Sequence, residues 1–195
     1  EYTVVPYDAE NVTDEKELRT LMAQDGTVKL GADIDLTTAV QVTADVVLEL
    51  NGHKLTVTKD TIGDGVFCVL AGGKLTINGE GIIDGVGDND YSMAIWSKGG
   101  EVIINGGTYT NDGAKSIEDD GITPNNNEVI YASKQGKITI NGGKFIGNTK
   151  NVELGTKFTL NLKDSDGSSI VVKGGTYYNF DPRAVYTEPE QPLNI

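Results

Sequence analysis

Residues 100–110 read Gly100-Glu101-Val102-Ile103-Ile104-Asn105-Gly106-Gly107-Thr108-Tyr109-Thr110, and the pattern recurs through most of the chain. A full copy follows at residues 136–146, a shorter copy precedes it at 73–79, and weaker copies lie at 47–52 and 170–178. The Asn-Gly steps begin at positions 51, 78, 105 and 141, so the period is close to 27 residues before it lengthens. A repeat of about 20–50 residues built from short strands predicts a solenoid.

Each period holds short apolar runs that are typical of β-strands. One period contains Ile82-Ile83, Met93-Ala94-Ile95-Trp96 and Val102-Ile103-Ile104. In Leu75-Thr76-Ile77 the outer residues are apolar and the middle one is polar, which is the alternation of a strand with one buried face. The sequence therefore predicts an all-β fold, a single-stranded right-handed parallel β-helix of about six coils.

The segments outside the repeats define the expected boundaries of the domain. Residues 1–12 are interpreted as an extended lead-in, and residues 183–195 as an extended tail. A short capping helix is predicted at about 13–24, because Thr13 or Asp14 can cap it and an apolar stripe follows. The β-helix domain is predicted to span residues 13–182, including this helix, which we expect to cover one end of the stack.

Stacking of the coils predicts two columns of side chains along the axis. Asparagine tolerates a left-handed turn backbone, and stacked amides can hydrogen-bond along the axis. The expected asparagine column contains Asn51, Asn78, Asn105 and Asn141. The second expected column is aliphatic and then aromatic, and it contains Leu55, Ile82, Tyr109, Phe145 and Tyr177.

These repeats resemble right-handed parallel β-helices of the pectin-lyase-like kind. More narrowly, they are similar to modules of bacterial surface adhesins and of phage fibre and capsid-decoration proteins. Residues 25–36 and 174–182 are similar to the way such modules begin and end. The resemblance covers residues 12–182 and implies the fold. For function it implies a structural or attachment role, glycan binding, or the polysaccharide chemistry of the enzymes that share this fold.

The charge of the chain limits its partners. Lys and Arg total 16 against 29 Asp and Glu, which gives a formal net charge of -13. Such a surface repels nucleic acid and anionic membranes. No apolar run approaches the ~18 residues of a membrane span. We therefore expect no nucleic-acid binding and no membrane insertion.

Polysaccharide lyase or hydrolase activity needs residues that the sequence does not place on the stack. Arg19 lies in the predicted helix and Arg183 in the tail, so neither is positioned as the basic residue of a lyase. A hydrolase needs converging carboxylates, and the paired Asp119-Asp120 falls in an irregular insertion. The single histidine, His53, is interpreted as a solvated turn residue. We expect no catalytic residues and no enzymatic activity.

Acidic residues gather in the segments that interrupt the repeats. Loops that leave the same corner of successive coils lie side by side, so segments 60–65, 84–91, 111–127 and 147–152 are expected to share one edge. Calcium takes about six to eight oxygen ligands, and adjacent loops could supply them. No cofactor is expected other than this calcium, and a solvated acidic surface is the simpler interpretation. The candidate cation-binding residues are Asp84, Asp88, Asp90, Asp119 and Asp120.

Aromatic side chains are the candidates for contact with a glycan or a partner, since aromatic rings can stack on sugars. They are Trp96, Tyr91, Tyr131 and Tyr178. The aromatic C-terminal end could also pack against copies of itself around a threefold axis, so a homotrimer or docking on a larger assembly is expected.

These features favour a non-enzymatic structural or attachment module of a phage particle, located on the virion surface. The alternative is a glycan-binding module of a bacterial surface adhesin, at the cell surface or secreted. A polysaccharide lyase or glycoside hydrolase is the third class.

Overall fold

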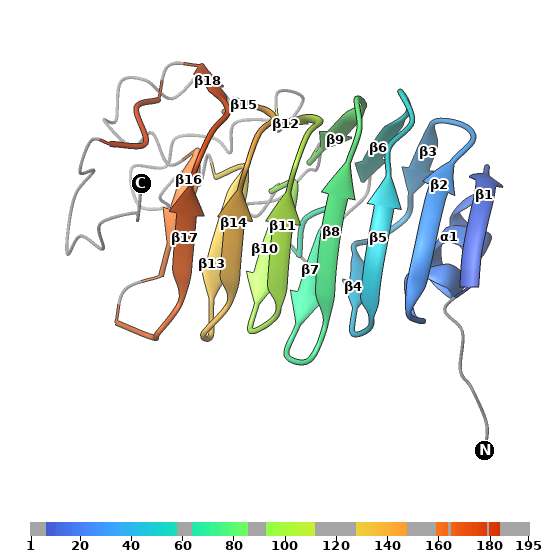
Figure 1. The fold of residues 1–195 in the computed structure, drawn as a ribbon, viewed down its shortest axis with the longest axis horizontal. Helices are drawn as coiled ribbons and strands as arrows, with labels where there is room; N and C mark the ends of the chain where they lie inside the picture. The colour runs from blue at the N-terminus through green and yellow to red at the C-terminus, as the bar shows by residue number, and fades with distance from the viewer. Residues whose placement is uncertain are drawn as a thin grey trace, which may run out of the picture.

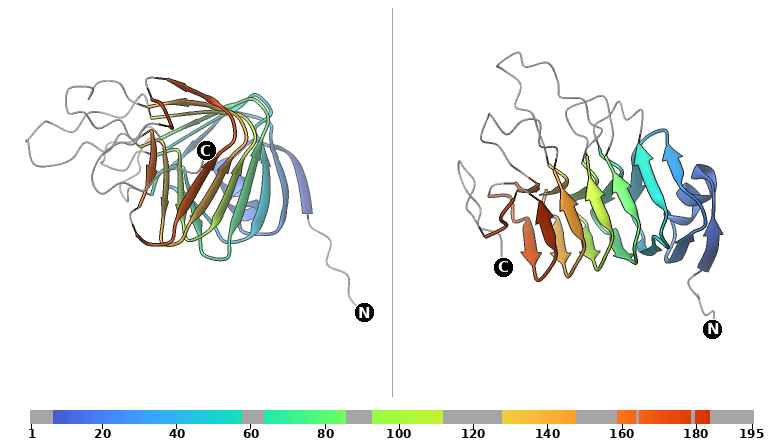
Figure 2. Two further views of the ribbon diagram at one scale, coloured as in Figure 1. Left: turned by 60° about the vertical axis from the view of Figure 1, so that its left-hand side comes forward. Right: turned by 90° about the horizontal axis from the view of Figure 1, so that it is seen from above.

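The computed structural model describes residues 7–57, 64–85, 93–111, 128–147, 159–163, 165–178 and 180–183. Its strands form three parallel β-sheets, and within each sheet the strands of successive coils stack along one axis (Figures 1 and 2). We name them sheets A, B and C. In sheet A the order is β1 (Tyr7–Val12), β2 (Gly26–Leu30), β5 (Asp45–Glu49), β8 (Lys74–Asn78), β11 (Glu101–Ile104), β14 (Lys137–Ile140) and β17 (Ser169–Val172).

Sheets B and C run beside sheet A with the same coil spacing. Sheet B contains β3 (Ile34–Leu36), β6 (Lys54–Val57), β9 (Ile82–Asp84), β12 (Thr108–Thr110), β15 (Lys144–Ile146) and β18 (Thr176–Tyr178). Sheet C contains β4 (Val40–Val42), β7 (Phe67–Leu70), β10 (Ile95–Lys98), β13 (Ile130–Ser133) and β16 (Leu160–Leu162).

From β2 onward, consecutive strands enter sheets A, B and C in turn, and each strand pairs in parallel with the strand of the same sheet one coil away. This arrangement is a parallel β-solenoid, which confirms the predicted fold class. The right-handed winding stays a prediction, which the strong preference for right-handed parallel crossovers favours.

The alternation within each strand decides what enters the core. In β11, Val102 and Ile104 are fully buried while Ile103 between them is partly exposed. The same pattern places Thr76 and Thr139 on the outer face between buried neighbours in β8 and β14. One continuous apolar core therefore runs inside the stack along the described coils.

Helix α1 (Glu15–Leu21) covers the N-terminal end of this core. The Asp14 carboxylate caps it by accepting the Glu17 N–H at 2.9 Å, and Leu18 and Met22 are fully buried. Arg19 ties the helix to the turn after β3, since it donates to the carbonyls of Thr38 and Ala39 and pairs with Glu15 at 2.6 Å. The helix is shorter than the predicted 13–24 segment, and β1 joins sheet A within the segment that was expected to be a lead-in.

Glycines let the coils approach closely at the corner where the chain passes from sheet C to sheet A. A Cβ atom added to Gly73, Gly100 or Gly136 would lie 2.3, 2.5 or 2.2 Å from a carbonyl oxygen of the preceding coil. No real Cβ tolerates such distances, so this recurring Gly is explained by backbone proximity.

The predicted aliphatic and aromatic column exists with one correction. Ile83, and not Ile82, aligns with Leu55 and Tyr109. The turn after Asn78 has one more residue than the turn after Asn105, and this shift leaves Ile82 38% exposed. Tyr109, Phe145 and Tyr177 stack with centroid separations of 5.2 and 4.9 Å.

Candidate functional site

The asparagine column forms a hydrogen-bonded ladder on the surface of the stack. Asn105 Nδ2 donates to Asn78 Oδ1 at 2.7 Å, and Asn141 Nδ2 donates to Asn105 Oδ1 at 2.7 Å. Asn78 Nδ2 in turn donates to Glu49 Oε1 at 2.7 Å. Each asparagine amide therefore forms a hydrogen bond with the side chain of the preceding coil.

The prediction for Asn51 was wrong. Glu49, two residues earlier, aligns with Asn78 and heads the ladder, because the turn between β5 and β6 is longer than the later turns. Asn51 has a left-handed backbone with φ 51° and donates to Leu30 O at 2.9 Å. Of the four asparagines predicted for the column, Asn51 alone has positive φ, so the ladder asparagines act through their amides and not through their backbone conformation.

All the long insertions are anchored at one corner of the solenoid. The connections from β6 to β7, β9 to β10, β12 to β13 and β15 to β16 each pass from sheet B to sheet C. Neighbouring anchors are linked, since Gly85 N–H donates to Thr110 O at 2.8 Å. The described ends of the insertions therefore share one edge, as the sequence predicts.

Of the five candidate cation ligands, only Asp84 lies within the described residues. Its side chain is 8% exposed and pairs with Lys54 Nζ at 2.9 Å. Asp64, at the same corner, pairs with Lys98 at 3.5 Å. Within the described ranges no three acidic, His or Cys side chains gather as a metal site would require. Asp88, Asp90, Asp119 and Asp120 lie outside those ranges, and calcium binding stays a prediction.

Glu128 is a buried carboxyl at this corner that sequence reasoning did not single out. It is 3% exposed, and its Oε2 has no hydrogen-bond partner among the described residues. Burial raises the pKa of Glu128 to about 7, although hydrogen bonds from its own backbone N–H and from the Asn161 side chain favour the ionised form. Its carbonyl accepts from Asn111 Nδ2 at 3.3 Å, which joins the two ends of the longest insertion.

Two of the four candidate aromatics meet on the outer face of sheet C. Trp96 and Tyr131 are aligned on adjacent strands, with ring centroids 5.6 Å apart and planes tilted by 33°. Lys98 Nζ lies 4.1 Å from the centroid of the Trp96 ring, and Trp96 Nε1 donates to Ser133 Oγ at 2.8 Å. Both rings are partly exposed, so this pair forms an aromatic platform next to the insertion corner.

The other two candidates do not join this platform. Tyr178 lies in β18 of sheet B, where its side chain is 46% exposed. Tyr91 lies outside the described residues. Tyr178 borders instead the C-terminal end of the stack, where a depression of about 650 Å³ is lined by residues of β17, β18 and the segment after them, among them Val172, Lys173, Tyr177, Phe180, Asp181 and Arg183.

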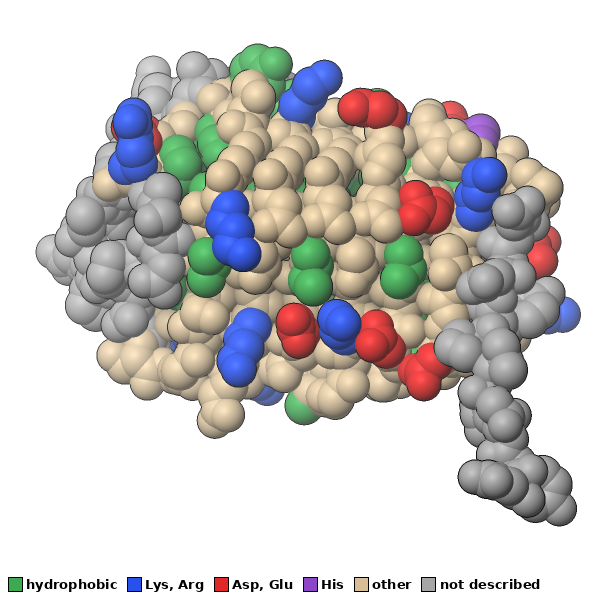
Figure 3. Space-filling model, viewed as in Figure 1, with side chains coloured by type: hydrophobic (Ala, Val, Ile, Leu, Met, Phe, Trp, Pro, Cys, Tyr) green, Lys and Arg blue, Asp and Glu red, His purple; other side chains and the backbone are tan. Residues whose placement is uncertain are grey.

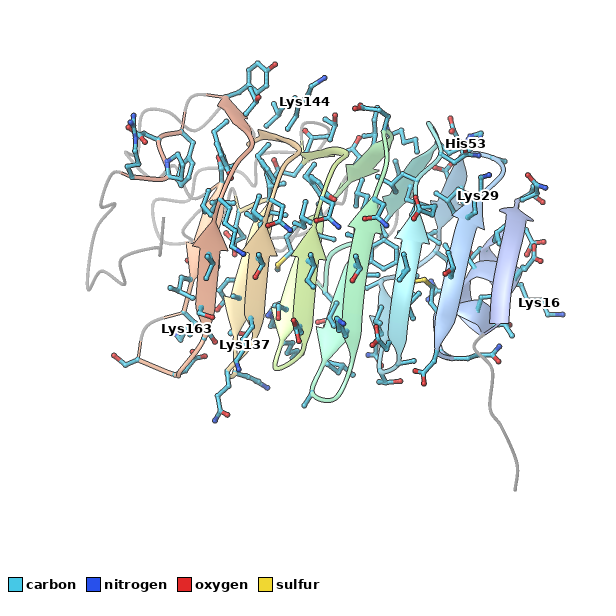
Figure 4. The ribbon with its side chains drawn as sticks, viewed as in Figure 1. Lys16, Lys29, His53, Lys137, Lys144 and Lys163 are labelled. Atoms are coloured by element: carbon cyan, nitrogen blue, oxygen red, sulfur yellow. The ribbon has the colours of Figure 1, made fainter. Side chains whose placement is uncertain are left out.

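The two arginines and the single histidine of the chain have structural partners. Arg19 is held in the cap, and Arg183 Nε pairs with Asp181 at 2.9 Å. His53 lies in the turn before β6 with Nδ1 3.4 Å from Asp33 (Figure 4). These residues lie in different parts of the molecule and do not converge on a common point.

Comparison with known proteins finds no matching family model, no matching curated protein and no matching solved structure. Among the described residues, no helix has the length and apolar character needed to cross a membrane. The class defined by the geometry is therefore that of a parallel β-solenoid with a capped N-terminal end.

Proposed function

We propose that this chain is a non-enzymatic structural and attachment module of a phage particle, of the fibre or capsid-decoration type. The observation that carries the proposal is the repetition of the same axial contacts from coil to coil. The amide ladder from Glu49 to Asn141 and the ring stack from Tyr109 to Tyr177 run along the axis beside three hydrogen-bonded sheets.

Such a stack is suited to bearing load. Parallel strands lie across the axis, so their backbone hydrogen bonds point along it and act together when the rod is pulled or bent. Each coil contacts only its neighbours, and the stability of the rod is the sum of these interfaces. The insertions, all anchored at one corner, would place contact segments in a line along the rod.

Self-association is the property that tests this function. Sedimentation velocity from low-micromolar to near-millimolar concentration is expected to show self-association, for which the sequence predicts a trimer. A chain that stays monomeric at every concentration, and that does not bind a particle or a partner shaft, would contradict the structural role.

A second function, glycan binding, is favoured by the platform of Trp96 and Tyr131. Aromatic rings held at a fixed angle on a rigid sheet can stack on sugar rings without an ordering cost. The test is direct because Trp96 is the single tryptophan of the chain. Titration with a panel of neutral and acidic oligosaccharides is expected to change its fluorescence.

The matched variants for this test are Tyr131→Ala and Tyr178→Ala. Loss of the fluorescence response and of calorimetric binding in Tyr131→Ala alone assigns the glycan to sheet C. Equal binding by both variants removes the assignment to the platform of sheet C, and no binding by the native chain removes the glycan hypothesis.

A further inference from the structure

We propose that the outer face of sheet A is an interface with a second copy of this chain. The two solenoids would lie antiparallel, related by a twofold axis that runs along the strand direction. This inference goes beyond the proposed function and does not depend on it, because it rests on three rows of side chains on sheet A.

One row carries charges of alternating sign. The register aligns Asp45, Lys74, Glu101 and Lys137 on successive coils. Asp45, Glu101 and Lys137 are exposed, and Lys74 lies 3.6 Å from Asp45. Figure 3 shows this face with blue and red side chains alternating along its lower part, and Figure 4 labels Lys137 at its C-terminal end.

The order of signs in this row is complementary to itself when reversed. Read along the chain it is minus, plus, minus, plus, and a twofold axis along the strands places it opposite plus, minus, plus, minus. Asp45 then faces Lys137 of the second copy, and Lys74 faces Glu101 of the second copy. All four pairs between the copies are attractive, and opposite charges across an interface fix its register.

The central row of the same face is also complementary to itself when reversed. From β2 to β17 it is free of charge and alternates Thr with an aliphatic residue along successive coils, in the order Thr27, Val47, Thr76, Ile103, Thr139, Val171. Each of these side chains is partly exposed. Asp8 of β1 is aligned with Thr27 and lies beyond the coils that would face the second copy. Reversal places every Thr opposite an aliphatic side chain, which suits two flat sheets packing face to face about 10 Å apart.

The third row contains the amide ladder and is neutral at its centre. Asn78 would face Asn105 of the second copy, and Glu49 would face Asn141. The two unfavourable pairs, each of Lys29 opposite Lys173, lie at the outer ends of the row, where long side chains reach solvent. At the ends of the charged row, Asp25 would lie opposite the neutral Ser169 of the second copy.

The size of the face predicts a weak dimer. Five or six coils at 4.8 Å and strands of about five residues give a patch of roughly 25 by 15 Å on each copy. Burying it on both copies removes less than the ~1,200 Å² that a standard stable interface buries. Since the net charge of -13 also repels, association is best measured at about 150 mM salt, where the screening length is about 8 Å.

Charge exchange separates contacts between copies from contacts within one chain. Lys74→Glu creates two like-charge contacts across the twofold axis and is expected to weaken dimerisation at least about tenfold. Lys74→Glu with Glu101→Lys makes the row minus, minus, plus, plus, which is again complementary when reversed. This double variant should regain the native dimer, although it has fewer attractive neighbours within its own chain.

The matched control is Asp45→Lys with Lys74→Glu. It restores the pair between positions 45 and 74 within the chain, but the row becomes plus, minus, minus, plus. Because this order is the same when reversed, like charges face each other between the two copies. Sedimentation equilibrium of the native chain and the three variants, each checked for native circular dichroism, gives the dissociation constants.

Rescue by the exchange at 74 and 101, without rescue by the exchange at 45 and 74, supports the interface. The opposite order, equal dissociation constants for all four proteins, or a monomeric native chain overturns it. A trimer whose mass none of the variants changes also overturns the twofold interface, while the structural role proposed above stands.

Discussion

Replacing Tyr109 with alanine is expected to lower the free energy of unfolding by about 3–5 kcal/mol, the cost of truncating a large buried aromatic residue. Tyr109 is fully buried and stacks on Phe145 with an interplanar angle of 10°. Its hydroxyl donates to Gly106 O at 2.9 Å, so the truncation removes a hydrogen bond as well as the ring. Urea unfolding followed by circular dichroism and by Trp96 fluorescence measures the loss.

Two variants separate the contributions to this effect. Tyr109→Phe keeps the stack and removes only the hydroxyl, so a loss of about 1 kcal/mol is expected. Tyr178→Ala removes the same side-chain type from an exposed strand position and should change stability by no more than about 0.5 kcal/mol. If Tyr109→Ala and Tyr178→Ala cost the same, the ring column does not stabilise the stack.

Replacing Glu128 with glutamine is expected to stabilise the chain by about 3 kcal/mol at pH 8 and to change it little at pH 5. Because burial raises the pKa of Glu128 from 4.5 to about 7, the folded state binds the proton more tightly than the unfolded state does. Stability therefore falls as the pH rises between these two values. Each pKa unit corresponds to about 1.4 kcal/mol, which gives the expected difference.

The glutamine variant stays neutral at every pH and cannot show this contribution. Free energies of unfolding at a series of pH values from 5 to 8 are the required measurement, and the difference between the two proteins isolates Glu128 from every other titrating group. Glu101→Gln, at an exposed position, is the control for replacing a carboxylate with an amide. If the curves of Glu128→Gln and the native chain run parallel, folding does not raise the pKa of Glu128.

The position of the ladder shows where prediction from the sequence failed. Asn51-Gly52 matches the later Asn-Gly steps, and the sequence alone offers no reason to separate it from them. Coils are aligned by strand pairing, and a turn can take up an extra residue without disturbing it. The same physical reason moved Ile83 into the column in place of Ile82.

Burial at the insertion corner could not be predicted either. Glu128 precedes a strand and resembles any solvated residue at the end of a loop. Its burial depends on the coils before and after it, which hold Asn111 and Asn161 around it. Likewise, the ability of aromatic rings to stack on sugars made Trp96 and Tyr131 candidates one by one, whereas their pairing needed the register of β10 and β13.

The repeat at residues 100–110 by itself determined the architecture of this protein: a parallel β-solenoid with inward Val and Ile and with insertions that share one corner. This follows because an alternating strand pattern that recurs with a nearly constant period can bury its apolar face only by stacking coil on coil. Only the tertiary structure decided which residues stand above one another. The glutamate that heads the amide ladder, the buried carboxyl at the corner and the charge order on sheet A are all consequences of register, which depends on turn length and on contacts between coils far apart in the sequence.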